Sequence, residues 1–402
     1  MQPKLRPIDA QWITHDEKLV LVLRDRLDLS GRMVLVPAAL APLLTLCDGT
    51  RDLGRLRASF ELRYGLALPP SLLENFVNQL DEALFLDSPR FQAATAEALA
   101  EYRAAPFRPL ALAGRSYPAD PRELGQAFAD YLGKADGKAP PEPSLRGLIC
   151  PHIDYTRGGP VYAQVWHRAR AALAEAEAVV VFGTDHMGAP GALTLTQQRY
   201  ATPWGALPPA AESISALASV LGETEAYAEE LHHRGEHSLE LALNWLHYTL
   251  GERAVPVVPI LCGGFQPYVE SGTESESTPA YGPAFTALRE ALAGRRLFVV
   301  AAADLAHVGP AFGDERPLGQ AQKEELADND ERRLRAACSG EPAAFLDALR
   351  ADSDRQRVCG LPPIYYALQL MDGAAGEVVA YDQCPADEEG GSLVSVAGVV
   401  FR

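Results

Sequence analysis

The chain has 402 residues, with 36 Lys and Arg against 53 Asp and Glu, and therefore a formal net charge of −17. Its 48% apolar and 22% charged residues are typical of globular proteins, and at about 100–200 residues per domain its length suits two domains. We expect neither a nucleic-acid partner nor an anionic membrane partner, because both bind clustered positive charge.

The sequence shows no membrane-spanning or secretory segment. Its longest uncharged apolar stretch, residues 33–47, contains two prolines and is shorter than the roughly 18–20 residues of a membrane span. The first twenty residues lack the apolar run of a signal peptide. The six cysteines lie far apart without C-x-x-C spacing, which is typical of reduced thiols. We therefore expect a cytoplasmic protein.

Residues 1–90 are predicted to form a small winged-helix-like unit. Two β-prone runs, KLVLVL and MVLVPA, lie within residues 18–38 on either side of a turn. The first 100 residues hold 11 basic and 13 acidic side chains, whereas a winged helix that reads DNA is normally basic. Helical patterns follow the strands at residues 38–47, 52–64 and 70–85.

The stretch LLTLCDGTRDLGRLRASFELRYG, with a following helix and ALFLDSPRF, resembles the PqqD-like winged-helix domains. The turn at residues 47–51 is its most specific part. This resemblance implies binding of a peptide or a partner enzyme, with the peptide added as a strand to a sheet edge. The competing interpretation is a small scaffold that packs on the larger domain. An Ala- and Glu-rich segment ending in prolines predicts a linker at residues 91–110 and a main domain at 111–402.

From residue 145 onward, short apolar runs alternate with helical segments. The runs are too short for helices and too uniformly apolar for a sheet with one exposed face, so they predict strands buried on both faces. The alternation indicates an α/β fold, with a layered α/β/α main domain. The predicted strands are 145–150, 178–183, 255–261 and 297–303, the helices are about 160–177, 212–232, 238–250 and 283–293, and residues 266–282 are a polar surface loop.

Three of these four strands run directly into histidine and aspartate. In open α/β sheets, ligands bind beyond the carboxyl ends of the strands, so the three segments should meet at one edge. A single buried histidine is commonly structural, but core packing does not require this convergence. The residues are His152 and Asp154 after the first strand, Asp185 and His186 after the second, and Asp304 and His307 after the fourth.

Clustered imidazoles favour a metal site. Neutral histidine is a common ligand of Zn, Cu, Ni and Fe, and each ligating ring usually has a carboxylate or carbonyl on its other nitrogen. Asp154, Asp185 and Asp304 lie one to three residues from the histidines. They are either such partners or ligands themselves, and the sequence leaves both roles open.

A fourth segment, Glu236-His237-Ser238-x-Glu240, precedes a predicted helix. Capping chemistry explains Ser238 and Glu240. It does not explain Glu236 and His237, which at a helix start suit a proton-transfer pair or an anion site.

Among the six cysteines, Cys359 is the one whose position most favours a thiolate on electrostatic grounds. It lies just before the apolar helical run IYYALQLM. The positive end of a helix dipole lowers the pKa of a thiol and favours the thiolate, which binds metals or attacks electrophiles.

Taken in order, these motifs resemble the Memo family, whose prokaryotic members are called AmmeMemoRadiSam system protein B. The match extends from residues 112–118 to residues 395–398 and covers nearly all of residues 110–402. It implies a fold similar to class III extradiol dioxygenases, which are non-haem iron enzymes that open catechol rings. The motifs are Pro151-His152-x-x-Tyr155, Gly183-Thr184-Asp185-His186, Glu236-His237-Ser238-x-Glu240, Asp304-Leu305-Ala306-His307 and Cys359-Gly360.

By this resemblance, iron or copper would be held by His152, His186 and Cys359. His237, Asp304 and His307 match the remaining pocket residues of the family, and one of these histidines would act as a general acid or base. As further residues of the pocket, or as partners that orient the ligands, we place Asp154, Tyr155, Asp185 and Glu236.

The chain also departs from the family pattern. Leu112 stands where the family has histidine, Ile153-Asp154 replaces Ala-Gly, and Thr184-Asp185-His186-Met187 replaces Pro-Ser-His-His. The additional carboxylates of Asp154 and Asp185 are an alternative to Cys359, because one of them can complete a two-histidine, one-carboxylate site.

The leading hypothesis is a metal-dependent oxidoreductase that uses Fe(II) or Cu, with Zn less favoured, on a small aromatic or peptide-borne substrate. The family name implies a radical SAM enzyme and an AMMECR-type protein as partners. One alternative is a non-catalytic metal-binding protein whose N-terminal unit docks a peptide or a radical SAM enzyme. Another is a zinc hydrolase with Glu236 as its base.

Overall fold

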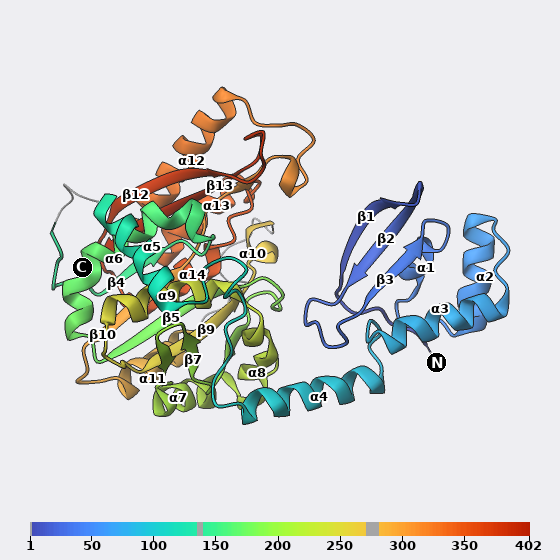
Figure 1. Cartoon of the computed structure of the whole chain (residues 1–402), viewed down its shortest axis with the longest axis horizontal. Helices are drawn as coiled ribbons and strands as arrows, with labels where there is room; N and C mark the ends of the chain where they lie inside the picture. Colours follow the sequence, from blue (N-terminus) through green and yellow to red (C-terminus); the bar gives the residue numbers. More distant parts are fainter. Residues whose placement is uncertain (1, 135–139, 271–280) are drawn as a thin grey trace. The chain divides into compact units, whose positions relative to one another are not determined.

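The structure is a computed structural model that describes residues 2–134, 140–270 and 281–402 (Figure 1). The chain divides into two compact units, Met1–Ala104 and Ala105–Arg402. Helix α4 (Pro89–Ala104) occupies most of the predicted linker and belongs to the first unit.

The first unit contains a three-stranded antiparallel sheet in the order β1-β2-β3. Strands β2 (Lys18–Arg24) and β3 (Met33–Pro37) match the two predicted runs. Strand β1 (Asp9–His15) was not predicted, because it is an edge strand with largely exposed side chains and no apolar run. The helices that follow are α1 (Ala41–Leu46), α2 (Leu53–Tyr64) and α3 (Pro70–Glu82).

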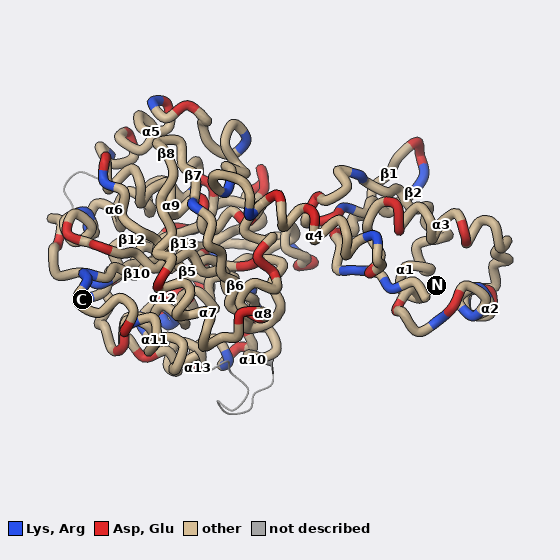
Figure 2. Tube along the Cα trace, turned by 90° about the horizontal axis from the view of Figure 1, so that it is seen from below, with Lys and Arg blue, Asp and Glu red and all other residues tan. Residues whose placement is uncertain are grey.

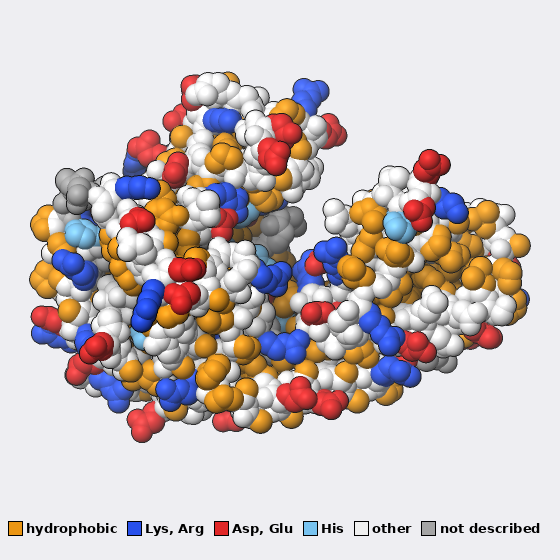
Figure 3. All heavy atoms as spheres, viewed as in Figure 1, with side chains coloured by type: hydrophobic (Ala, Val, Ile, Leu, Met, Phe, Trp, Pro, Cys, Tyr) orange, Lys and Arg blue, Asp and Glu red, His pale blue; other side chains and the backbone are white. Residues whose placement is uncertain are grey.

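This unit exposes a group of large apolar side chains. Trp12, Leu19, Met33 and Leu35, all on its strands, are 48% to 62% exposed. Apolar side chains cover much of the face of this unit that Figure 3 shows. Such exposure is what a docking surface requires, but the assignment to PqqD-like domains stays a prediction.

The second unit is built on a mixed sheet whose parallel centre consists of the four predicted strands. They are adjacent in the order β4-β10-β5-β9. Antiparallel strands extend the sheet on both sides, and β7 (Tyr200–Thr202) with β8 (Gly205–Leu207) forms a separate hairpin. The central strands are β4 (Gly147–Cys150), β5 (Ala178–Asp185), β9 (Val257–Gly263) and β10 (Leu297–Ala302), and the antiparallel ones are β6 (Leu193–Leu195), β11 (His307–Val308), β12 (Gly376–Pro385) and β13 (Leu393–Phe401).

Helices cover both faces of this sheet (Figure 1), which confirms the predicted α/β class. Alternate residues of β5 enter two different hydrophobic clusters: Val180 and Phe182 face one layer, and Val179 and Val181 face the other. One layer contains α7 (Ala211–Leu221), α11 (Gly282–Ala291), α13 (Pro342–Arg350) and α14 (Leu361–Met371), and the other contains α5 (Pro121–Lys134), α6 (Tyr155–Glu175) and α9 (His237–Leu250).

The remaining helices are α12 (Gln320–Cys338) and several short ones. Helix α12 packs against β12 and α13. The predicted loop at residues 266–282 begins instead with helix α10 (Gln266–Glu270), and residues 271–280 lie outside the described residues. The other short helices are α8 (Glu223–Ala226), η1 (Glu230–Arg234) and η2 (Pro310–Phe312).

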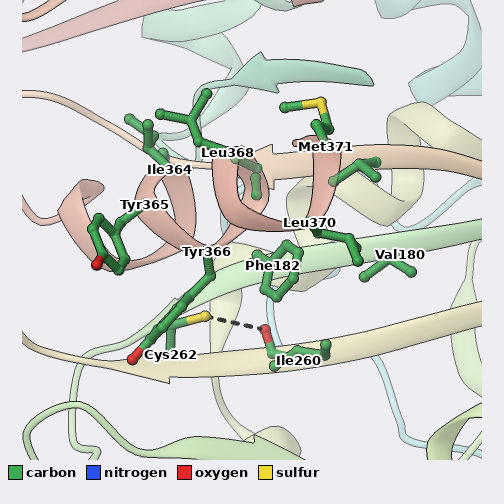
Figure 4. Packing of buried hydrophobic residues seen from close by; sticks show 14 of the residues in the cluster. Val180, Phe182, Ile260, Cys262, Ile364, Tyr365, Tyr366, Leu368, Leu370 and Met371 are labelled. Carbon is green, nitrogen blue, oxygen red and sulfur yellow. Dashed lines mark hydrogen bonds between the residues drawn. The ribbon is translucent and has the colours of Figure 1, made fainter. Parts of the chain in front are cut away.

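Helix α14 is held on the sheet by a dense apolar contact. Figure 4 shows Tyr366 and Leu370 of α14 against Phe182 of β5 and Ile260 of β9. The helix begins directly after Gly360, where an added Cβ would lie 2.3 Å from the carbonyl oxygen of Asp304. The glycine therefore permits close approach to the end of β10, and this approach fixes the position of Cys359.

Acidic and basic residues are distributed along the traces of both units (Figure 2). Among the helices of the described ranges, none is both long and apolar enough to cross a bilayer.

Candidate metal centre

The register of the sheet brings the predicted segments together. Strand β10 lies between β4 and β5, and its Ala302 pairs with Cys150 on one side and Gly183 on the other. Because the three strands are parallel, their next residues emerge at the same edge, as expected for a ligand site. Two residues after Ala302, Cys150 and Gly183 come Asp304, His152 and Asp185, respectively.

Three histidine rings meet beyond this edge. One nitrogen from each of His152, His186 and His237 lies within 4.8 Å of the others. The ring centroid of His152 is 5.3 Å from that of His186 and 5.5 Å from that of His237, and the last two stack at 4.8 Å. His237, expected as a proton-transfer residue, is thus part of the same cluster as two predicted metal ligands.

Each of these rings is oriented through its Nδ1 atom. Nδ1 of His152 lies 3.0 Å from the carbonyl oxygen of Ala302. Nδ1 of His186 lies 3.1 Å from both carboxylate oxygens of Glu236, and Nδ1 of His237 lies 3.0 Å from Oε1 of the same residue. Since carbonyl and carboxylate oxygens only accept hydrogen bonds, we assign the ring hydrogens to Nδ1. The Nε2 lone pairs are then left for a ligand, as in metal-binding histidines.

Glu236 is the shared partner of two rings and the N-cap of α9. Its carboxylate accepts hydrogen bonds from the amides of His186, His237 and Ser238. Burial favours the neutral acid, but His186 and His237 outweigh it, and the pKa of Glu236 lies well below its usual value. The carboxylate is therefore ionised and fully engaged in positioning its neighbours.

This arrangement corrects the predicted capping pattern. The cap is Glu236, whereas the hydroxyl of Ser238 donates to the carbonyl of Thr184 at 2.8 Å. Glu240 forms a completely buried ion pair with Arg108. The spacing of the segment resembles a capping box because all of its polar residues cluster at the start of α9, but each one has a tertiary partner.

Cys359 lies next to the histidine cluster. Its Sγ atom is 3.2 Å from Nε2 of His152. The expected lowering of its thiol pKa is wrong: burial, followed by the nearby Asp304 carboxylate, raises the pKa well above its usual value. Burial therefore outweighs the dipole of α14. A cation at the rings would favour the thiolate again.

Asp304 and His307 complete the wall of the site. Oδ1 of Asp304 accepts hydrogen bonds from the amides of His152 and Ile153, at 2.8 and 3.2 Å. Nδ1 of His307 lies 3.2 Å from two carbonyl oxygens, those of residues 305 and 357, which leaves its Nε2 as an acceptor. Burial lowers the pKa of His307, so its ring is neutral at pH 7 and can accept a proton.

These groups open into a cavity of about 440 Å³, a volume that suits one small molecule or side chain. Its lining includes the polar side chains of His152, His186, His237, Asp304 and His307. Apolar side chains line the rest, among them Leu112, Leu241 and Phe312. Arg157 also lines it, paired with Asp154 at 2.6 Å.

The remaining predicted residues have partners other than the three rings. Asp154 caps α6 by accepting from the amide of Arg157. The hydroxyl of Tyr155 points into the core and donates to the carbonyl of Leu241 at 2.9 Å. The carboxylate of Asp185 pairs with Nδ1 of His232 at 2.8 Å. The predicted alternatives to Cys359 therefore have other partners.

Sequence reasoning missed Arg108, which lies in the predicted linker. Its guanidinium is completely buried and donates to the carbonyls of His233 and Glu236, at 2.8 and 2.7 Å. It thus fixes the backbone of the residue that orients two of the rings. An arginine beside prolines gives no local signal of burial, and only its tertiary partner Glu240 explains it.

Comparison with known proteins identifies the family of the chain. The family model described as Memo-like protein matches residues 108–400. A MEMO1 family protein of Aquifex aeolicus is 27% identical over 407 residues, covering 100% of both chains. One of Thermus thermophilus is 30% identical over 338 residues, covering 82% of this chain and 93% of its own. One of Methanopyrus kandleri is 28% identical over 309 residues, covering 73% and 98%.

The matched region contains the sheet edge, the three histidines and Cys359, and the predicted resemblance is confirmed: the chain belongs to the Memo family.

Proposed function

We propose that the chain is a metal-dependent oxidoreductase with non-haem iron or copper at His152, His186 and His237. Cys359 is the additional ligand. One observation carries the proposal: three rings from separate segments have Nδ1 tied to a carbonyl or carboxylate oxygen, and one nitrogen of each lies within 4.8 Å of the others. Imidazole and thiolate together favour iron, copper or zinc over magnesium and calcium.

When bound, such a metal supplies Lewis acidity and electron transfer. The protein residues supply binding and proton transfer. Nε2 of His307 accepts a proton from a substrate hydroxyl group in the cavity, while Leu241 and Phe312 contact an apolar or aromatic body. The apolar part of the lining supports a small aromatic substrate or an aromatic side chain of a peptide.

A second candidate function is metal storage or delivery without catalysis. The distance of 3.2 Å between Sγ of Cys359 and Nε2 of His152 supports it, because a metal that keeps all three histidines and the thiolate at once would have a closed four-coordinate site without a position for substrate. In this case the exposed apolar residues of the N-terminal unit would dock a peptide or a radical SAM partner.

The hydrolase alternative has less support. A zinc hydrolase would need Glu236 free to activate water, but this carboxylate is buried and accepts hydrogen bonds from three backbone amides.

Oxygen uptake by the iron-loaded protein separates oxidation from storage. With catechol or a substituted phenol, we expect uptake by the wild type and its loss in His307→Gln, which keeps the iron content. His15→Ala is the control, because His15 is exposed and lies in the first unit. If the iron-loaded wild type takes up no oxygen with a panel of such compounds, storage is favoured. If oxygen uptake is unchanged in His307→Gln, the role given to His307 is contradicted.

A further inference from the structure

A second group of potential metal ligands lies outside the site described above. One oxygen of Asp185, one oxygen of Glu229 and one ring nitrogen of His232 lie within 4.8 Å of one another. None of the three belongs to the three-histidine cluster. Asp185 is buried, and the other two are partly buried.

The local fold explains why two of these side chains share one direction. Glu229 is the N-cap of the 3-10 helix η1, and His232 follows three residues later. In a 3-10 helix, residues three apart lie on the same side. A Glu-x-x-His pair is also the spacing by which helices present a carboxylate and an imidazole to one metal ion.

The third donor, Asp185, is aimed at this pair by a tight turn. Its Oδ1 accepts from the amide of Met187 at 3.0 Å, and its Oδ2 lies 2.8 Å from Nδ1 of His232. A Cβ atom at Gly188 would lie 2.7 Å from the carboxylate, so the glycine lets the backbone wrap around it. The same turn is linked to Glu229, whose carboxylate accepts from the amide of Ala189 at 3.0 Å.

We propose that Asp185, Glu229 and His232 form a second divalent-cation site, distinct from the histidine cluster. Two carboxylates and one neutral imidazole carry a net charge of −2, which matches the cation. This mixed oxygen and nitrogen set suits Zn²⁺, Mn²⁺ or Fe²⁺. On binding, the ring of His232 loses its Nδ1 hydrogen to solvent and takes up one at Nε2, so the imidazole stays neutral and the ion lies between Nδ1 of His232 and Oδ2 of Asp185.

The site also connects to the proposed redox centre through the chain. Asp185 is the last residue of β5, and His186 follows it directly. A cation on Asp185 would therefore fix the turn that carries His186. The two sites use different ligands, so each can be removed without changing a ligand of the other.

Equilibrium dialysis of the full chain against Zn²⁺, with metal counted by elemental mass spectrometry, tests the proposal. We expect two equivalents for the wild type and one for Glu229→Gln and for His232→Gln. Gln at 229 keeps an acceptor for the amide of Ala189, and Gln at 232 keeps a donor to Asp185, so both variants should fold. Unchanged far-ultraviolet circular dichroism and the retention of one equivalent of Zn²⁺ would show that both variants are folded.

The double variant His152→Ala, His186→Ala identifies which site is occupied. It should lose the other equivalent and keep the one that depends on His232. If the wild type binds a single equivalent that His232→Gln retains, or if His232→Gln still binds two, the second site is refuted and the three residues form only a hydrogen-bonded cluster. If the double variant keeps the wild-type stoichiometry while Glu229→Gln and His232→Gln each bind one equivalent fewer, the second site stands and the proposed function fails.

Discussion

Removal of one partner of the buried ion pair between Arg108 and Glu240 should strongly destabilise the second unit. Both side chains are 0% exposed. Glu240 also accepts hydrogen bonds from the amides of Ala111 and Leu112 and from the hydroxyl of Tyr117. One carboxylate thus connects the segment preceding the sheet to helix α9, which carries His237.

We predict that Glu240→Gln lowers the free energy of unfolding by about 3–5 kcal/mol, the usual cost of removing one partner of a buried pair. Gln has nearly the same shape but only one acceptor oxygen, so the loss combines the missing charge beside Arg108 with buried donors that face the NH2 group and lose their acceptor. Glu240→Ala should cost more, because each buried donor left without an acceptor adds about 1–3 kcal/mol. Against a usual total of about 5–15 kcal/mol, either loss is large.

Urea unfolding followed by tryptophan fluorescence measures this loss. In a Trp12→Phe background the remaining tryptophans, at positions 166, 204 and 245, all lie in the second unit, so the signal reports on that unit alone. The matched control is Glu331→Gln, which breaks an ion pair with Arg335 whose side chains are 69% and 72% exposed. This control should cost less than about 1 kcal/mol. If Glu240→Gln costs no more than the control, the reasoning from burial is wrong.

Three further predictions concern the site and its surroundings. Burial raises the pKa of Asp354 from 3.8 to about 6. The contribution of this group to the free energy of unfolding is therefore largest below about pH 4 and is lost as the pH rises through 6. Asp354→Asn should therefore gain up to about 3 kcal/mol on the wild type between pH 4 and pH 7 in urea unfolding, at about 1.4 kcal/mol per pKa unit; a difference independent of pH would contradict this. Glu236→Gln removes the charge that orients two rings and should weaken metal binding by about 10–100-fold in a chelator competition, with unchanged circular dichroism; unchanged affinity would exclude the orienting role. Gly360→Ala places a Cβ 2.3 Å from the carbonyl oxygen of Asp304 unless the backbone moves, so it should lower both the unfolding temperature and the metal content. The control Gly235→Ala should change neither, because its Cβ would meet no atom within 4 Å.

The sheet centre could be predicted because its strands are buried on both faces and therefore consist of continuous apolar runs. Strand β1 gave no such signal, since it is an exposed edge strand. Strand β13 is also a largely apolar run that is buried along its whole length, so the same local signal was present there and was overlooked.

The site was predictable to the extent that strand ends carry histidine and aspartate. The sequence could not show that Glu236 serves two rings, because this depends on how α9 meets the end of β5. It also could not show the raised pKa of Cys359, since a helix start indicates the dipole but not the depth of burial. Arg108 and His232 were overlooked for the same reason: their partners lie 132 and 47 residues away in the chain.

The central claim is that the three histidines hold a redox metal. Elemental mass spectrometry of anaerobically purified protein tests it most directly, with His152→Ala, His186→Ala and His237→Ala compared with the wild type and the exposed-site control His15→Ala. We expect each of the three variants to lose the same single equivalent of iron or copper, while the control retains it. Wild-type protein without iron or copper, or equal content in all variants, would contradict it.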